Sequence, residues 1–574
     1  MRKLLKYLDG YKKECVLAPL FKMLEAVFEL TVPLVISHMI DSGIGNGAAP
    51  VIRNCFLILL ALGLLGLIVS CTAQFFAAKA ATGFSKGLRH DLFEHILSFG
   101  FPQIDRCTTS TMITRMTVDV NVLQNGVNMF LRLFLRSPFI VAGAMIMAFT
   151  IDVKSAMIFV LVIAALAVTV TVIMRTNIPL LKKAQKKLDE LLRLVRENLS
   201  GARVIRAFTL EDEQIADFKT ANDELTGMQL LAGRISSLLN PLTYVLVNLG
   251  IVALIFTGSR QVSIGALSTG AVVALYNYMS QILLELIKFA NLIVTMNRTF
   301  ASAIRVNEMF EVTADDFSTA VAAPDNEGDA PAAEFSDVSL KYHENADDAI
   351  SNISFKIMKG QTFGIIGGTG AGKSTVAHIL SGFYKATGGK VLISGKDIND
   401  IDRKLLGKHV GIVMQSAVLF AGTIRENLRW GNPSATDEEI MDAVKTAVCT
   451  EVVEEKGGLD AIIEAGGKNL SGGQRQRLSI ARVLVGKPEI LILDDSASAL
   501  DYMTDLKLRN NIAELSYHPT VIIIAQRTVS VSGCENILVL DDGEMAGLGT
   551  HEELLKSSDV YREIYESQYG KEEG

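Results

Sequence analysis

Long apolar stretches dominate the first half of the chain, and each is long enough to cross a membrane as a helix, which takes about 20 residues. Two of them, 55–78 and 155–174, contain no charged residue. A third is interrupted near its start by Arg132 and Arg136. We expect six membrane-spanning helices, at about 16–36, 55–78, 129–151, 155–174, 235–258 and 261–292.

Charged residues inside these stretches need polar surroundings. Lys22, Glu25 and Glu29 follow an i, i+3, i+7 spacing and share one face of the first helix. A charge that faces lipid at the bilayer centre costs roughly 2.5–3.5 kcal/mol, so this face should point into the bundle, as should Glu285 and Lys288 in the last helix. Either Glu25 or Glu29 attracts cationic, amphipathic substrates, or the charges form internal pairs, Lys22 with Glu25 and Glu285 with Lys288. We favour the internal pairs.

Basic residues indicate how the chain is oriented. Lysine and arginine are frequent before the first stretch and in the long segments 79–128 and 175–234, whereas segments 41–51, 152–154 and 258–264 hold few. By the positive-inside rule, the N-terminus, both long segments and the second half of the chain lie in the cytoplasm. The long segments keep helical spacing, which predicts helices that continue beyond the bilayer. We therefore expect a multi-pass protein of the cytoplasmic membrane.

The character of the chain changes after the last apolar stretch. Residues 311–333 are acidic and rich in Ala and Pro, which is typical of a linker. From residue 334 onward, short apolar runs typical of strands alternate with helical patterns, which indicates an α/β domain. We expect an all-α, six-helix membrane domain with long cytoplasmic helical extensions at 1–310, the linker at 311–333 and the α/β domain at 334–574.

The composition narrows the class of protein further. Hydrophobic residues make up 49% and charged residues 20% of the 574 residues, which excludes a disordered chain. The six cysteines form no CxxC pair, so neither a zinc site nor a disulfide framework is indicated. A net charge of −7 argues against nucleic acid as a partner.

The strongest motif of the second domain is a glycine-rich loop between a strand and a helix. Residues 367–374 match G-x-x-x-x-G-K-[ST] and follow the apolar run 363–366. Glycines let backbone N–H groups turn toward phosphates, and a helix N-terminus adds a positive dipole end. The lysine would contact the terminal phosphates and the serine would bind Mg²⁺. The predicted phosphate-binding residues are Gly367, Gly368, Thr369, Gly370, Ala371, Gly372, Lys373, Ser374 and Thr375.

Further candidate ligands follow other predicted strands and begin another helix. Asp494 ends the apolar run 490–493, where a carboxylate is suited to Mg²⁺, and Gln415 follows the run 410–414 as a candidate metal and water ligand. A second anion site is expected where Ser471 can cap a helix or offer its hydroxyl to a phosphate. This second motif consists of Leu470, Ser471, Gly472, Gly473 and Gln474. Both anion sites make sense if two such domains pair head to tail.

With these motifs the chain resembles a half-transporter of the ATP-binding cassette (ABC) exporter family over essentially its whole length. It is particularly similar to the degenerate-site subunit of the heterodimeric multidrug exporters of bacteria. The resemblance implies ATP and Mg²⁺ as cofactors, and a second half-transporter, the lipid bilayer and a small amphipathic substrate as partners. It also implies that Tyr342 stacks on adenine, that residues 498–501 form the D-loop, and that residues 111–120 and 197–208 belong to the first and second coupling loops.

Two residues depart from the family pattern. Asp495 stands where the family has the glutamate that orients the attacking water, and Gln526 stands in place of the switch histidine. Aspartate is one methylene shorter, which places its carboxylate about 1.5 Å farther from the water, and glutamine cannot hold a proton as imidazole can. Such losses typically cost about 10²- to 10⁴-fold in rate. The resemblance thus implies a chain that binds Mg·ATP, hydrolyses it poorly, and lends residues 470–474 to its partner's site.

Three alternatives to this interpretation stay open. The two departures could be tolerated in a slow homodimer. The chain could be a regulatory ATP-sensing membrane subunit that gates a partner without moving a substrate. The exported compound could also be a lipid or a peptide.

Overall fold

The computed structural model of the protein describes residues 2–313, 330–343, 346–496 and 500–569. They form two compact units, the first from Met1–Leu97 and Thr109–Val312, the second from Ser98–Thr108 and Thr313–Gly574. Most of the expected linker, 314–329, lies outside the described residues, as do Ser498 and Ala499 of the expected D-loop.

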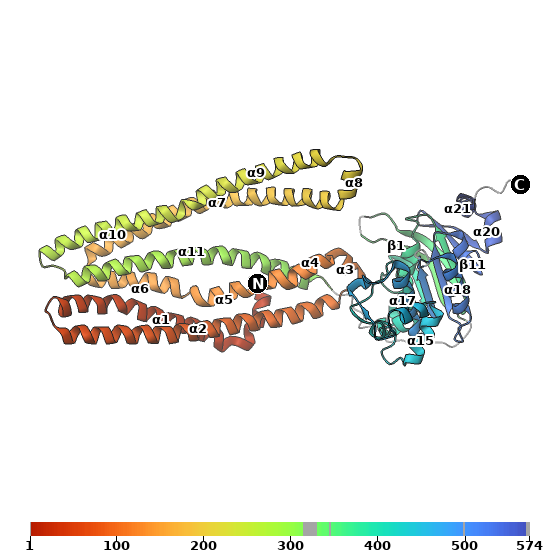
Figure 1. Cartoon of the computed structure of the whole chain (residues 1–574), viewed down its shortest axis with the longest axis horizontal. Helices are drawn as coiled ribbons and strands as arrows, with labels where there is room; N and C mark the ends of the chain where they lie inside the picture. Colours follow the sequence, from red (N-terminus) through yellow and green to blue (C-terminus); the bar gives the residue numbers. More distant parts are fainter. Residues whose placement is uncertain (1, 314–329, 344–345, 497–499, 570–574) are drawn as a thin grey trace. The chain divides into compact units, whose positions relative to one another are not determined.

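The first unit is helical, as the apolar periodicity predicts (Figure 1). Its elements are the 3₁₀-helix η1 (Arg2–Tyr11), α1 (Lys12–His38), the π-helix η2 (Met39–Ile44), α2 (Ala49–Leu97), α4 (Thr109–Thr114), the π-helix η3 (Arg115–Asp119), α5 (Val120–Leu133), α6 (Arg136–Ile151), α7 (Val153–Ser200), α8 (Ala202–Ala207), α9 (Glu211–Ser237), α10 (Leu239–Ser263) and α11 (Thr269–Glu311).

Among the described residues, five helical segments are long and apolar enough to cross a membrane. They are Ala49–Leu97, Thr109–Ile151, Val153–Ser200, Glu211–Ser263 and Thr269–Glu311. The predicted count of six is not confirmed, because α1, which contains the expected span 16–36, carries Lys22, Glu25 and Glu29 in its middle. Three charges in one stretch lower its hydropathy below that of an ordinary membrane helix.

The long helices continue beyond the apolar stretches. At about 1.5 Å per residue, a helix that spans 30 Å of hydrocarbon needs about 20 residues; α2 has 49 and α7 has 48. Helix α7 begins where the Asp152 carboxylate accepts a hydrogen bond from the Ser155 N–H at 2.7 Å, which satisfies an otherwise unpaired donor. Helices α7 and α9 pack side by side and are joined by the short α8 (Figure 1). The predicted helical extensions are therefore present.

The second unit contains three sheets among its described residues. Their orders are β2-β1-β4-β5, β12-β11-β3-β10-β9-β6 and β7-β8. The strands are β1 (Ala333–Leu340), β2 (Ile350–Ile357), β3 (Thr362–Gly367), β4 (Gly388–Ile393), β5 (Lys396–Asp397), β6 (Val410–Val413), β7 (Gly422–Thr423), β8 (Ile462–Ile463), β9 (Ile490–Asp494), β10 (Thr520–Ala525), β11 (Asn536–Asp541) and β12 (Glu544–Gly549). Parallel pairing joins β11, β3, β10, β9 and β6, whose apolar side chains are buried on both faces.

The second unit also contains helical segments. They are α3 (Phe101–Cys107), α12 (Lys373–Leu380), η4 (Ile398–Asp400), α13 (Arg403–His409), α14 (Ile424–Leu428), α15 (Asp437–Thr446), α16 (Thr450–Glu455), η5 (Ala465–Gly467), α17 (Gly472–Val485), α18 (Tyr502–Ala513), α19 (Thr528–Val531), α20 (His551–Ser557) and α21 (Asp559–Tyr569). The expected α/β alternation is confirmed, and the apolar runs 363–366, 410–414 and 490–493 coincide with β3, β6 and β9.

Residues 98–108 are grouped with the second unit rather than with the helices on either side of them in the chain. The expected first coupling loop, 111–120, lies in α4, η3 and the first residue of α5, within the first unit, and its coupling role stays a prediction. In α3 the Phe101 ring stacks on Phe383, with centroids 3.8 Å apart. The sequence analysis did not single out Phe101, an aromatic residue that lies ahead of the expected loop and makes this contact.

Candidate nucleotide-binding site

The glycine-rich loop connects the C-terminal end of β3 to the N-terminus of α12, as predicted. Gly370 and Gly372 have φ values of 87° and 91°, in the left-handed region that favours glycine. A Cβ atom on Gly372 would lie 2.7 Å from the Ala349 carbonyl oxygen, so no other residue fits without a shift of the backbone. This loop leaves the first N–H groups of α12 without helical partners, as an anion site requires.

Lys373 and Ser374, at the end of this loop, contact different groups. The Lys373 ammonium donates to the carbonyl oxygens of Gly367 at 2.9 Å and Gly368 at 2.5 Å. The Ser374 hydroxyl donates to the Asp494 carboxylate at 3.2 Å. A hydroxyl and a carboxylate are the hard oxygen ligands that Mg²⁺ prefers, and the ammonium is a point charge for phosphates. The donor set therefore fits a magnesium-bound polyphosphate.

Most of the residues predicted for the chain's own site line one pocket of about 310 Å³. They are Tyr342, Thr369, Gly370, Gly372, Lys373, Ser374, Thr375, Gln415, Asp494, Asp495 and Gln526. Gly367, Gly368 and Ala371 do not line the pocket. The carbonyl groups of Gly367 and Gly368 accept hydrogen bonds from Lys373, and Ala371 is buried. Tyr342 shares a hydrogen bond of 3.0 Å with the Thr375 hydroxyl.

Burial changes the acidity of the charged groups in this pocket. It lowers the pKa of Lys373 and raises the pKa of Asp494 and of Asp495. In each case the cause is desolvation, which disfavours the charged form. All three ions would regain solvation energy from a ligand of opposite charge, a metal for the carboxylates and a phosphate for the ammonium.

The two departures from the family pattern lie next to one another. Asp495, with φ of 45°, directs its carboxylate toward two amides. Its Oδ2 atom accepts from the Gln415 side chain at 3.3 Å and from the Gln526 side chain at 3.5 Å. The structure thus brings together three residues from three segments at the ends of β6, β9 and β10, since parallel strands end at one edge of the sheet.

The second glycine motif does not line this pocket. Ser471 caps α17 by accepting from the Gln474 N–H at 3.2 Å, and the Gln474 side chain accepts in return from the Ser471 N–H at 2.9 Å. Ser471 and Gly472 are exposed, and Leu470 is buried. The predicted helix cap is confirmed, and Gly473 beside it is partly exposed.

The first unit, called the membrane unit from here on because it holds the long apolar helices, also contains a cluster of charged side chains. Arg136 of α6, only 6% exposed, donates to both carboxylate oxygens of Glu29 in α1 at 2.8 Å and to Glu285 in α11 at 2.7 Å. The Lys22–Glu25 contact is 2.5 Å and the Lys288–Glu285 contact is 2.8 Å. Both predicted internal pairs are therefore present, and Arg136 is a hub that sequence reasoning missed.

Two of these helices, α1 and α11, also make contacts near a proline in α1. Pro33 has no N–H, so the Glu29 carbonyl four residues earlier loses its helical partner. The Gln281 amide of α11 donates to that carbonyl at 3.2 Å, and the Tyr278 hydroxyl donates to the Leu30 carbonyl at 2.7 Å. Side chains of a neighbouring helix thus satisfy backbone groups that lipid could not.

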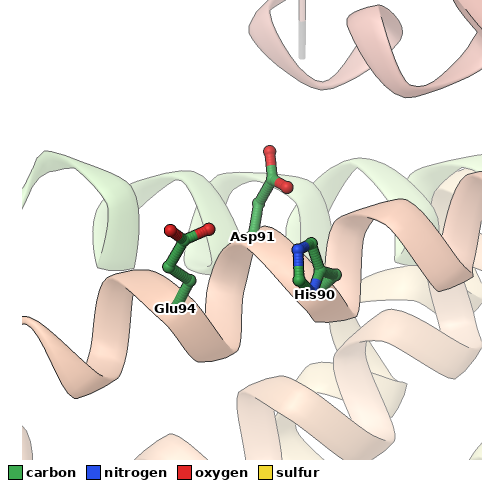
Figure 2. Close-up of side chains that lie close together, drawn as sticks. All are labelled: His90, Asp91 and Glu94. Carbon is green, nitrogen blue, oxygen red and sulfur yellow. The ribbon is translucent and has the colours of Figure 1, made fainter.

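A further cluster of polar side chains lies on α2 and consists of His90, Asp91 and Glu94 (Figure 2). The side-chain atoms of these residues that could bind a metal lie within 4.8 Å of one another. Asp91 already accepts from the Tyr7 hydroxyl at 2.8 Å and from Lys6 at 3.2 Å. This carboxylate therefore fastens η1 to α2.

Comparison with known proteins places these features in a family. Residues 15–286 match the ABC transporter transmembrane region and residues 350–498 match the ABC transporter family. The chain is 35% identical, over all of its length and 99% of the relative's, to the uncharacterized ABC transporter ATP-binding protein YfiB of Bacillus subtilis. It is 31% identical over 98% of its length, and 97% of the relative's, to the similarly described MT1311 of Mycobacterium tuberculosis.

The fold also matches a solved structure. A bacterial Atm1-family ABC exporter with ATP bound superposes with a TM-score of 0.78 at 23% identity, covering 98% of this chain and 99% of the other. At that identity the likeness concerns the fold alone.

Proposed function

The chain belongs to the ABC transporter family, as an exporter-type half-transporter with a fused nucleotide-binding domain, and we propose that it is one subunit of a heterodimer whose own ATP site is degenerate. It is a multi-pass membrane protein and a transport ATPase with its nucleotide-binding domain in the cytoplasm. Its exported substrate is hydrophobic or amphipathic. The observation that carries this proposal is the arrangement of Asp495 and Gln526.

These two residues leave the pocket without a competent base. The Asp495 carboxylate accepts from two amides, Gln415 and Gln526, so it is held at the edge of the pocket by donors that take up no proton. Replacing a positioned base in this way typically costs about 10²- to 10⁴-fold, roughly 3–5 kcal/mol of activation barrier. The pocket retains nucleotide but contributes little to turnover.

The binding residues are complete. Lys373 would neutralise the terminal phosphates, Ser374 and Asp494 would hold Mg²⁺, Gln415 would approach the metal and its water, and Tyr342 would stack on the base. ATP bound there supplies a phosphoanhydride bond that these residues orient. The cap of α17, within residues 470–474, exposes Ser471 and Gly472 and would complete the site of a second subunit, whose glutamate and histidine would carry out hydrolysis.

The surface where α7 and α9 are joined by α8 is separate evidence for a second subunit. A groove of about 330 Å³ is lined by the apolar residues Val195, Leu199, Ile205, Ile215 and Phe218, together with Asn198, Glu211 and Gln214. Leu199 is 74% exposed, and nearby Phe208 is 70% exposed. Apolar surface of this kind at a water-exposed helix tip is typical of an interface. It coincides with the expected second coupling loop, 197–208, which we assign to the partner's nucleotide-binding domain.

We assign α1 as the sixth membrane span. Its charges are paired, Lys22 with Glu25 and Glu29 with Arg136, and the side chains of Lys22 and Glu25 are only 7% and 12% exposed. Charges that pair in the bundle interior are tolerated in a membrane helix. With α1 included, each chain contributes six membrane spans to the proposed transport pathway.

The test is ATP turnover by the purified chain in lipid nanodiscs, alone and with its co-purified partner. Alone, we expect at least about 100-fold slower hydrolysis than in the pair. Restoring both residues, Asp495→Glu with Gln526→His, should raise the rate of the isolated chain, and Lys373→Met in that background should abolish the gain. Rapid hydrolysis by the unmodified chain alone would overturn the degenerate assignment.

A further inference from the structure

A continuous chain of side-chain contacts leads from the nucleotide pocket to α3. The ring of Tyr342, in the pocket wall, meets the ring of Tyr384 edge to face, with centroids 4.8 Å apart and planes at 86°. The Tyr384 hydroxyl donates a hydrogen bond to the Asp105 carboxylate of α3. All three residues lie within the second unit, and Tyr384 is only 9% exposed. Tyr384 is therefore the one residue between Tyr342 and Asp105 on this path.

Neighbouring groups make this contact stiff. His378 lies beside both tyrosines, with its Nδ1 atom 3.4 Å from the Tyr342 hydroxyl and its ring centroid 5.9 Å from that of Tyr384. Phe101 of α3 stacks on Phe383, the residue before Tyr384. Close packing leaves little room for independent movement, so interfaces of this kind transmit displacement.

The hydrogen bond at the end of this path is durable. Burial, and then the bond to Asp105, raise the pKa of Tyr384 above its ordinary value. The hydroxyl consequently stays protonated and remains a donor throughout the physiological pH range. A bond from a hydroxyl to a carboxylate is also stronger than one between neutral groups.

We propose that the Tyr384–Asp105 hydrogen bond communicates base occupancy of this chain's own pocket to α3, so that a poorly hydrolytic site still acts as a nucleotide sensor. The inference rests on the proposed binding of ATP in that pocket. It depends on the base, because the base is what Tyr342 would touch, whereas the phosphates contact the glycine-rich loop. Tyr384 is a positioning residue, since it does not line the pocket. Along the chain, α3 lies directly between α2 and α4, so a movement of α3 would be passed to these helices through the backbone.

A native cysteine can report this signal. Cys107 is the last residue of α3 and is partly exposed. In full-length chain carrying Cys15→Ser and Cys71→Ser, the rate of Cys107 modification by a soluble maleimide is measured with Mg²⁺ alone, with Mg·ATP and with Mg·tripolyphosphate. We expect Mg·ATP to change the rate at least about fivefold, a modest coupling, and tripolyphosphate to change it less than about twofold because it has no base.

Three variants isolate the hydrogen bond. Tyr384→Phe keeps the ring against Tyr342 and removes only the hydroxyl, so ATP affinity should stay within about threefold while the response at Cys107 is lost. Asp105→Ala should lose the response as well. Asp105→Asn keeps an acceptor oxygen and should retain it, and the two Asp105 variants carry the test if Tyr384→Phe does not fold.

Two results would overturn the inference: an unchanged response in Tyr384→Phe or Asp105→Ala, or an equal response to tripolyphosphate. ATP binding by the parent chain, measured by equilibrium dialysis, separates this inference from the proposed function. Binding without any change at Cys107 contradicts the relay alone, whereas failure to bind Mg·ATP contradicts both.

Discussion

The charges of the membrane unit and those of the nucleotide pocket are buried or half-buried, yet they are arranged differently. Around Arg136 each charge is matched within the unit, three acidic side chains (Glu25, Glu29, Glu285) against three basic ones (Lys22, Arg136, Lys288). In the pocket, Lys373, Asp494 and Asp495 surround an open cavity of about 310 Å³. A cluster that neutralises itself stabilises helix packing, whereas a cluster around a cavity is arranged for a ligand.

The largest effect should follow from breaking the matched cluster. Arg136→Met leaves Glu29 and Glu285 without their shared partner, and removing one member of a buried ion pair costs about 3–5 kcal/mol. Thermal and denaturant unfolding in nanodiscs should show this loss. The double variant with Glu29→Gln removes the carboxylate whose close partner is lost, while Glu285 keeps Lys288, so it should be more stable than Arg136→Met alone. A double variant less stable than the single one would show that the cluster does more than hold the helices together.

In the nucleotide pocket, loss of a charge should affect ligand affinity more than the stability of the fold. Lys373→Met removes a buried ammonium whose pKa burial already lowers, so the unfolding free energy without nucleotide should change by less than about 1 kcal/mol. ATP affinity should fall by about 100-fold, or about 2.7 kcal/mol. Equilibrium dialysis and unfolding of the same samples measure both quantities. Lys373→Arg is the matched control for charge. A large loss of stability without a loss of affinity would remove the distinction between the two clusters.

Sequence patterns were sufficient where function depends on local spacing. The glycine-rich loop, the cap at Ser471 and the strand ending at Asp494 are each specified by fewer than ten consecutive residues, and the structure contains the corresponding elements. The pairs Lys22–Glu25 and Glu285–Lys288 follow from i, i+3 spacing on one helix.

Contacts between distant segments could not be predicted from spacing. Arg136 meets Glu29 across 107 residues and Glu285 across 149, and one-dimensional periodicity does not specify which helices become neighbours. The same holds for Asp105 and Tyr384, 279 residues apart. The cost of the charges in α1 likewise depends on partners that only the folded bundle provides, and hydropathy alone does not include those partners.

A smaller effect is expected at the proline of α1. Gln281→Leu leaves the Glu29 carbonyl without its donor, which should cost about 1–2 kcal/mol in unfolding free energy. Pro33→Ala restores an N–H in α1 that can bond the same carbonyl, so the double variant should recover most of that loss. A double-mutant cycle measures the coupling. Purely additive effects would contradict the assignment of Gln281 as the substitute donor.

The smallest effect is expected for substrate charge, and it tests whether the membrane cluster is as self-contained as its contacts indicate. Glu25 is bonded to Lys22 at 2.5 Å and its side chain is 12% exposed, so its charge is already compensated. Glu25→Gln should therefore change the export of a monovalent cationic dye, relative to a neutral one, by less than about threefold, or about 0.7 kcal/mol. Lys22→Gln with Glu25→Gln preserves neutrality and is the control for lost pairing. If the single variant lowered the cationic ratio tenfold while the double variant did not restore it, Glu25 would be attracting substrate, and the cluster would belong with the nucleotide pocket as a site arranged for a ligand.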